Sequence, residues 1–196
     1  MHAALAGQHH LLPAIQGAVA HYHRGTAEHS ARVARLALLT GEVLGLDDDD
    51  LEAVSWAGIL HDVGKLGVDE AILSKPGPLT EAEWTEVKRH PTVGSDLLVL
   101  MSARLAPIAA GVEAHHERWD GTGYPHGFAG EAIPLIGRIL AVADVFDSIT
   151  HPRAYRIEVF STAEANALLE EGIASQFDPA VVDAFLSLAP SELLVA

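Results

Sequence analysis

Apolar residues recur at helical spacing along most of this sequence, and that pattern constrains the fold more than any other feature. One face of a helix repeats about every 3.6 residues, whereas one face of a strand repeats every second residue. No strand-like alternation is longer than four residues, and no segment is repeated internally. The sequence therefore predicts an all-α fold, a helical bundle.

Capping residues set several of the expected helix boundaries. Thr80 with Glu83 forms a capping box, Asp178 before Pro179 is typical of a helix start, and Thr26 is expected to cap the first helix of the domain. Pro91 is expected to interrupt the helix at His90. The expected helices span residues 26–44, 51–60, 68–73, 81–90, 92–101, 107–114, 136–147, 162–170 and 179–186. We expect residues 1–25 to form an N-terminal helical extension and residues 26–196 to form one domain.

Composition excludes several classes of protein. A net charge of −15 would repel a long nucleic acid, and no apolar run approaches the roughly 20 residues that span a bilayer. No signal peptide is apparent, because the first 20 residues lack a basic segment and are interrupted by Pro13. The sequence has no cysteine, which excludes disulfides, thiolate zinc sites and iron–sulfur clusters and fits a cytoplasmic protein. Any metal site here must use nitrogen and oxygen ligands.

The stretch His61-Asp62-Val63-Gly64-Lys65 follows an apolar helix and carries the strongest local signal. An imidazole beside a carboxylate suits a divalent metal of borderline softness, and the two oxygens of Asp62 could bridge two ions. We interpret Gly64 as the residue that lets the backbone turn and return Lys65 to the same place, where an ammonium suits an anionic substrate such as a phosphate. The alternative is a helix end capped by a histidine.

Further histidines and an aspartate lie at helix ends or on apolar helix faces. His29 shares a helix side with Val33 and Leu36, and Asp144 lies among apolar residues, where an unpartnered carboxylate would cost several kcal/mol. A lone histidine in such a place is as well explained as a core residue. The full set reads more naturally as a two-metal site: His29, His61, Asp62, His90, His115, His116 and Asp144. Five other histidines in the first 23 residues are interpreted as solvated.

The ordered motifs resemble the HD-GYP domain, a branch of the HD superfamily of metal-dependent phosphohydrolases. The resemblance covers roughly residues 26–188. It rests on the lone His29, on His61-Asp62-x-Gly64-Lys65 and His90-Pro91, on the run from His115 to Gly123-Tyr124-Pro125, on Asp144-Val145-Phe146-Asp147, and on Gln176-Phe177-Asp178-Pro179. It implies an HD-type helical bundle enclosing a multinuclear metal site, and hydrolysis of cyclic di-GMP to linear pGpG and, in some members, to GMP.

The resemblance also implies a role for each site residue. One metal, commonly iron or manganese in the family, would take His29, His61, Asp62 and Asp144, and a second would take His90, His115 and His116. Asp62 would bridge them, and the nucleophile would be a water or hydroxide held between the metals. Lys65 would contact the scissile phosphate, while Tyr124, Arg153 and Arg156 would bind the substrate. The Gly-Tyr-Pro loop is also tied to partner proteins in the family.

Three departures from the family pattern qualify these expectations. Gly25 stands where some members have an acidic ligand to a third metal, so we expect two metals. Arg153-Ala154-Tyr155-Arg156 replaces the usual Arg-Pro-Tyr-Arg, and Gly137 stands where alanine is usual. Residues 1–25 are too short for a sensory domain. We therefore expect either that a separate protein regulates this domain or that the sequence is a fragment of a longer chain. Two alternatives stay open, a catalytically weak signalling or binding module and a phosphohydrolase of another cyclic dinucleotide or nucleotide.

Overall fold

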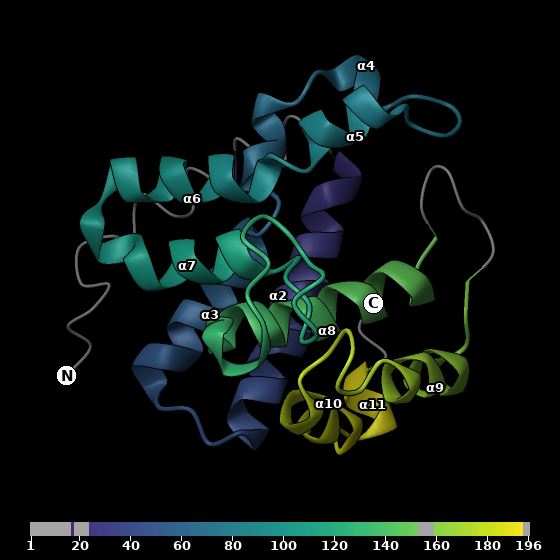
Figure 1. Cartoon of the computed structure of the whole chain (residues 1–196). Coiled ribbons are helices and arrows are strands. Elements are labelled where there is room, and N and C mark those ends of the chain that lie inside the picture. Colours follow the sequence, from purple (N-terminus) through teal and green to yellow (C-terminus); the bar gives the residue numbers. More distant parts are fainter. Residues whose placement is uncertain (1–16, 18–23, 153–158, 194–196) are drawn as a thin grey trace.

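The computed structural model describes residue 17, residues 24–152 and residues 159–193, and these residues form a helical bundle (Figure 1). The described residues contain one isolated β-bridge, between Ile173 and Phe177. The longer helices are α2 (Arg24–Val43), α3 (Asp48–Leu60), α6 (His90–Met101), α7 (Ala106–Ala114), α8 (Leu135–Thr150), α9 (Thr162–Glu171) and α10 (Pro179–Leu186). The shorter elements are η1 (Val63–Gly67), α4 (Glu70–Leu73), α5 (Glu81–Val87), η2 (Ala103–Leu105), η3 (Gly130–Ala132) and α11 (Pro190–Leu193). The all-α prediction is confirmed.

Helix α8 is the central element of the bundle. It packs against α2, α3 and α7 on one side and against α9 and α10 on the other, while α6 and α7 lie side by side (Figure 1). Its apolar residues Ile139, Leu140 and Phe146 are almost fully buried, and the Phe146 ring lies 4.9 Å from that of Phe185 on α10. No helix among the described residues is long and apolar enough to cross a membrane.

Most of the predicted helix boundaries agree with the structure because they depend on local chemistry. The Thr80 capping box is present in both directions, and Asp178 accepts a hydrogen bond from the backbone N–H of Ala180. The predicted interruption near Pro91 is present, but it lies at residues 88–89 rather than at His90, because Pro91 is accommodated in the first turn of α6, which begins at His90. The predicted cap at Thr26 is wrong, since α2 already begins at Arg24 and includes Thr26 in its first turn. Helix α11 was not predicted.

Two glycines allow the elements that carry the site to approach closely. A Cβ atom on Gly58 of α3 would lie 2.5 Å from Cα of Ala34 on α2. A Cβ atom on Gly64 would overlap the carbonyl oxygen of His90, so this glycine lets η1 pack directly on the start of α6. Gly64 does not have a positive φ angle. Glycine is therefore needed at this position for the close packing of η1 on α6, and not for the sharp turn that we inferred from the sequence.

Candidate metal centre

The histidines and aspartates singled out in the sequence come together in two adjacent groups. Within each group, one ligand atom per residue lies within 4.8 Å of the others. The first group is His29 from α2, His61 from the end of α3, and Asp144 from α8. The second is His90 from the start of α6 with His115 and His116 from the end of α7. These are two buried candidate metal-binding groups, as the sequence predicted.

Three of these histidines are oriented by the same local hydrogen bond. Each lies at a helix end or just beyond one, and its Nδ1 donates to the backbone carbonyl oxygen three residues earlier. The bonds join His61 to Gly58 (2.8 Å), His90 to Val87 (2.8 Å) and His115 to Val112 (2.5 Å). Helix C-terminal carbonyls lack intrahelical partners, which explains why a histidine at this position finds an acceptor. Because Nδ1 carries the proton, Nε2 presents a lone pair to the centre.

His29 is oriented by a carboxylate instead of a carbonyl. Its Nδ1 lies 2.6 Å from Oδ2 of Asp147, which is fully buried, and its Nε2 lies 3.1 Å from Oδ1 of Asp144. Arg32 reaches the same Asp147 carboxylate with Nε at 2.5 Å and Nη2 at 3.2 Å. Burial opposes ionisation, but the bonds from His29 and Arg32 lower the pKa of Asp147 below its usual range. An ionised carboxylate only accepts, so His29 donates through Nδ1.

Asp62 faces both groups. Its Oδ2 lies 3.4 Å from Nε2 of His61 in the first group, and its Oδ1 lies 3.3 Å from Nε2 of His90 in the second. Lys65 donates to Oδ2 across 2.6 Å, which confirms that the chain returns to this point after Gly64. Burial alone would raise the pKa of Asp62, but Lys65 and the neighbouring imidazoles hold it well below its usual range. A single ionised carboxylate thus connects the two groups.

The donor set fits a cation. Burial lowers the pKa of His90, and burial together with His116 lowers that of His115 well below its usual range, so both rings are neutral near pH 7. Their Nε2 atoms nevertheless face each other at 3.3 Å, with both Nδ1 protons already used on carbonyls. Nε2 of His61 is buried without a hydrogen-bond partner. Facing lone pairs and a buried orphan acceptor need a proton or a metal ion between them.

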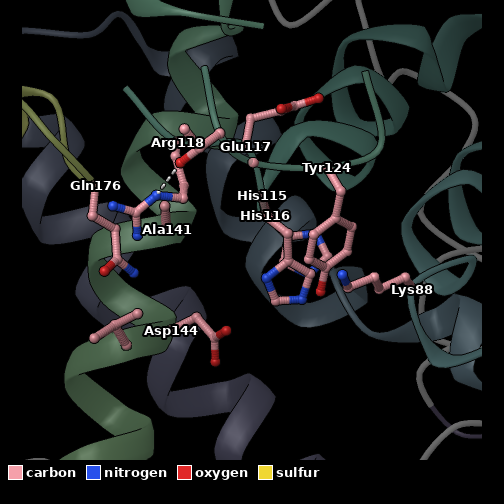
Figure 2. A pocket seen from close by; sticks show the side chains of 12 residues that line it. Lys88, His115, His116, Glu117, Arg118, Tyr124, Ala141, Asp144 and Gln176 are labelled. Atoms are coloured by element: carbon pink, nitrogen blue, oxygen red, sulfur yellow. Dashed lines mark hydrogen bonds between the residues drawn. The ribbon is translucent and has the colours of Figure 1, made fainter. Parts of the chain in front are cut away.

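A cavity of about 310 Å³ opens beside the second group (Figure 2). Tyr124 lies at its wall and stacks on the ring of His116, with centroids 4.9 Å apart at 29°. Burial lowers the pKa of His116 to about 4, which keeps that ring neutral at pH 7. Asp144 lines the same cavity, so a ligand there would be adjacent to both candidate groups. Figure 2 shows Lys88 and Tyr124 on one side of the cavity and Arg118, Gln176 and Asp144 on the other.

The loop that carries Tyr124 is fixed by a buried glutamate, Glu117, which is not among the predicted site residues. Glu117 is 3% exposed and accepts hydrogen bonds from the backbone N–H groups of His126 (2.7 Å) and Gly127 (3.1 Å). Hydrogen bonds to a charged acceptor are stronger than neutral ones. Because Glu117 directly follows the two histidines at the end of α7, it ties the loop to the second group.

The predicted site residues therefore divide into three sets. Six of the seven predicted metal ligands form the two groups, the seventh, Asp62, contacts both groups, and Lys65 and Tyr124 lie beside them. Arg153 and Arg156 lie outside the described residues, so their predicted role in binding substrate stays a prediction. Four residues at the site were missed as functional candidates: Arg32, Lys88, Glu117 and Asp147.

The sequence matches the HD domain family over residues 14–181. The chain belongs to this family. Within the HD domain family it is of the HD-GYP type, which confirms the resemblance drawn from its motifs. The predicted boundary between residues 1–25 and 26–196 stays a prediction.

Individual relatives of this HD domain act on cyclic dinucleotides. It is 43% identical over 163 residues to the "Cyclic di-GMP phosphodiesterase response regulator RpfG" of Xanthomonas campestris pv. campestris, covering 83% of this chain and 43% of that protein. It is 41% identical over 170 residues to the "3'3'-cGAMP-specific phosphodiesterase 3" of Vibrio cholerae, covering 85% of this chain and 36% of that protein. The chain spans less than half the length of these relatives.

Solved structures show the same fold. The crystal structure of a cyclic GMP-AMP specific phosphodiesterase of V. cholerae, V-cGAP3, superposes with a TM-score of 0.65 at 23% identity. The match covers 84% of this chain and 45% of that one. At this level of identity, the likeness shows that the two proteins share the HD-type bundle, and it carries no information about the substrate.

Proposed function

We propose that this HD domain is a metal-dependent phosphodiesterase that hydrolyses cyclic di-GMP to linear pGpG, with further hydrolysis to GMP as a second step. The observation that carries the proposal is the position of Asp62, one oxygen of which lies 3.3 Å from His90 and the other 3.4 Å from His61. A carboxylate that faces two groups of imidazoles is the arrangement that a two-metal hydrolase requires.

In this proposal, each group of side chains holds one divalent ion. His29, His61 and Asp144 would hold the first, His90, His115 and His116 would hold the second, and Asp62 would bridge them. We propose iron or manganese, because imidazole and carboxylate ligands suit both. Bound there, the ions would supply an activated water and would polarise the phosphoryl oxygens. Hydrolysis adds that water across one phosphodiester and gives a 5′-phosphate and a 3′-hydroxyl.

The chain's own residues would position the substrate. Lys65, whose Nζ is 2.6 Å from Asp62, is close enough to the proposed bridge to bind the phosphate that reacts. Tyr124 offers an aromatic face at the cavity wall, and bases stack on such faces. Arg153 and Arg156 follow α8 in sequence, and we propose that they add positive charge around the substrate's phosphates.

A second substrate has comparable support. The two relatives described above are similarly close to this chain, and their names give cyclic di-GMP for one and 3′3′-cGAMP for the other. Both molecules contain two phosphodiesters in one ring and differ in one purine. A cyclic dinucleotide is therefore the substrate class that we propose, with cyclic di-GMP as the first candidate.

The loop after α7 also offers a surface for a protein partner. Phe128 is 42% exposed and stacks on the ring of His126, with centroids 4.9 Å apart. We propose that a regulatory protein binds there. Substituting Phe128 with serine should abolish capture of such a partner and leave hydrolysis by the isolated domain unchanged.

The test of the proposed enzyme is hydrolysis by metal-depleted protein reloaded anaerobically with Fe²⁺ or Mn²⁺. We expect about two metals per chain by elemental analysis, and turnover of cyclic di-GMP or 3′3′-cGAMP followed by chromatography. Asp62→Ala should lose nearly all activity, while the exposed Asp183→Ala on α10 should keep it. Metal-loaded protein that leaves both cyclic dinucleotides intact would reject the proposal, and turnover by Asp62→Ala would reject the bridging role.

A further inference from the structure

The sequence contains three lysines, and one of them, Lys88, differs from the other two in its ion pairing. Lys65 is held by Asp62 at 2.6 Å, and Lys75 is held by both oxygens of Glu83 at 2.6 and 2.9 Å. Lys88 has no carboxylate within ion-pair distance among the described residues. Lys88 is therefore the one lysine of this chain whose ammonium is not paired with a described carboxylate.

Lys88 is also the lysine that lines the cavity beside the candidate metal centre. It caps the C-terminus of α5, two residues before His90. Its ammonium lies 5.4 Å from the centroid of the Tyr124 ring, and Figure 2 shows it directed at that ring across the cavity from Gln176. The side chain is exposed at its helix end, so a ligand can reach the ammonium without displacing a protein group.

The other cation that lines this cavity is already neutralised. Arg118 lies 3.1 Å from Asp120 through Nη2 and donates through Nε to the hydroxyl of Thr122 at 3.0 Å. These bonds hold the guanidinium to its own loop. Of the two cations described at the cavity wall, Lys88 is therefore the one with charge to offer to an anionic ligand.

A cyclic dinucleotide brings two negative charges into this space. One phosphodiester would lie at the candidate metal groups and Lys65, where the positive charge of the ions is concentrated. The other would lie elsewhere on the same ring, in a cavity that also contains the carboxylate of Asp144. A second anion next to carboxylates needs a cation of its own.

We infer that Lys88 binds the second, non-reacting phosphodiester of the substrate and so selects two-phosphate ligands over single phosphodiesters. This inference rests on the proposed function and deepens it. Lys88 is a binding residue in this scheme and takes no part in bond breaking. The competing explanation is structural, because a lysine over an aromatic ring can also steady the loop that carries Tyr124.

The test compares two substrates on metal-loaded protein. One is the cyclic dinucleotide that wild-type protein hydrolyses best, and the other is bis(p-nitrophenyl) phosphate, which has a single phosphodiester. For Lys88→Ala we expect KM for the cyclic dinucleotide to rise about tenfold, equivalent to about 1.4 kcal/mol, with kcat nearly unchanged. Kinetics on the single phosphodiester should not change. Lys88→Arg should restore most of the loss.

Arg89→Ala is the matched control, because Arg89 is the next residue and carries the same charge. It is 67% exposed and pairs with Glu86 at 3.5 Å, and it does not line the cavity. It should leave both substrates unaffected. Raising the salt concentration should weaken cyclic dinucleotide binding more in wild-type protein than in Lys88→Ala, since exposed charges are screened.

Each remaining outcome decides against one of the two ideas. Equal losses on both substrates would mean that Lys88 acts through the Tyr124 loop, and an unchanged KM would mean that it does not contact the substrate. Either result overturns the inference while wild-type turnover of the cyclic dinucleotide upholds the proposed function. Wild-type protein that cleaves the single phosphodiester but no cyclic dinucleotide would reject the proposed function, and the role of Lys88 with it.

Discussion

Replacing Asp147 by asparagine should weaken the first candidate metal group without changing its shape. Both oxygens of this carboxylate are used: Oδ2 lies 2.6 Å from Nδ1 of His29 and 3.2 Å from Nη2 of Arg32, and Oδ1 accepts from Nε of Arg32 and lies 3.1 Å from Nδ1 of His151. Asparagine has one oxygen and one NH₂ group, so the donors on one side of the carboxylate lose their acceptor. The side chain keeps its volume, which separates the loss of an acceptor from the opening of a cavity.

Either orientation of the amide carries a cost. If NH₂ replaces Oδ1, the largely buried guanidinium of Arg32 loses the acceptor of its Nε. If NH₂ faces His29, the ring must accept at Nδ1 and carry its proton on Nε2, which removes the lone pair that a metal needs. A buried donor without an acceptor costs about 1–3 kcal/mol, and at about 2 kcal/mol the Tm would fall by about 4–8 °C for a domain of this size. Metal affinity should fall about 10–100-fold, or about 1.4–2.7 kcal/mol.

The assay is thermal unfolding of Asp147→Asn and wild-type protein in chelator and in buffered Mn²⁺. Bound metal stabilises the folded chain in proportion to the logarithm of its affinity. The Tm difference between the two proteins should therefore be larger in Mn²⁺ than in chelator. The exposed Asp183→Asn on α10 is the control and should match wild type in both. If the Tm difference between Asp147→Asn and wild-type protein is the same in chelator and in Mn²⁺, Asp147 only supports the fold. If Asp147→Asn has the same Tm as wild-type protein in both buffers, the whole argument is refuted.

Three other predictions concern the frame of the site. Gly64→Ala should lower the free energy of unfolding by about 1–3 kcal/mol and should lower the metal content, because the new Cβ overlaps the backbone of α6. The control is Gly67→Ala in the same η1 element, whose new Cβ meets only a side chain and should cost less. Glu117→Gln should speed hydrogen exchange at residues 126–127 about tenfold, which mass spectrometry can measure; unchanged exchange would contradict its role as the loop anchor. The hydrogen bond from its lysine partner lowers the pKa of Glu83 from 4.5 to about 2, so the stability that Glu83 contributes is present above about pH 4.5 and is lost as the pH falls towards 2. Glu83→Gln should therefore have a lower Tm than wild-type protein at pH 7 in low salt, and the two proteins should have the same Tm near pH 2. Equal Tm values at pH 7 would contradict a stabilising role for this ion pair.

The elements that could be predicted from the sequence are those whose cause is local. The capping box at Thr80 and the cap at Asp178 involve residues within a few positions of each other, so their chemistry can be recognised without the fold. The helix end at His61 follows the same logic. A histidine just beyond a helix has a free carbonyl three residues behind it, and that signal could also have predicted which ring nitrogen faces the centre.

Arg32 and Asp147 were missed because they depend on contacts between distant parts of the chain. His29 and Asp147 are 118 positions apart, and only the packing of α2 on α8 brings them together. Gly64 was singled out for the wrong reason, since the demand on it comes from the backbone of α6 rather than from its own φ angle. The sequence pattern identifies unusual residues such as Gly64, but it does not show which distant segment of the chain contacts them in the fold.

The position of Asp147 on α8 shows how one helix can serve two purposes. Asp144 and Asp147 are three residues apart, so they project from nearby points on the same side of the helix. Asp144 contacts Nε2 of His29 and Asp147 contacts Nδ1, so the two carboxylates hold opposite edges of one ring. A shift of α8 by one residue would break both contacts together. The spacing of these two aspartates therefore couples the position of Asp144, a candidate metal ligand, to which nitrogen of the His29 ring carries the proton. For this reason we expect the uncharged Asn in Asp147→Asn to change metal binding at the first group.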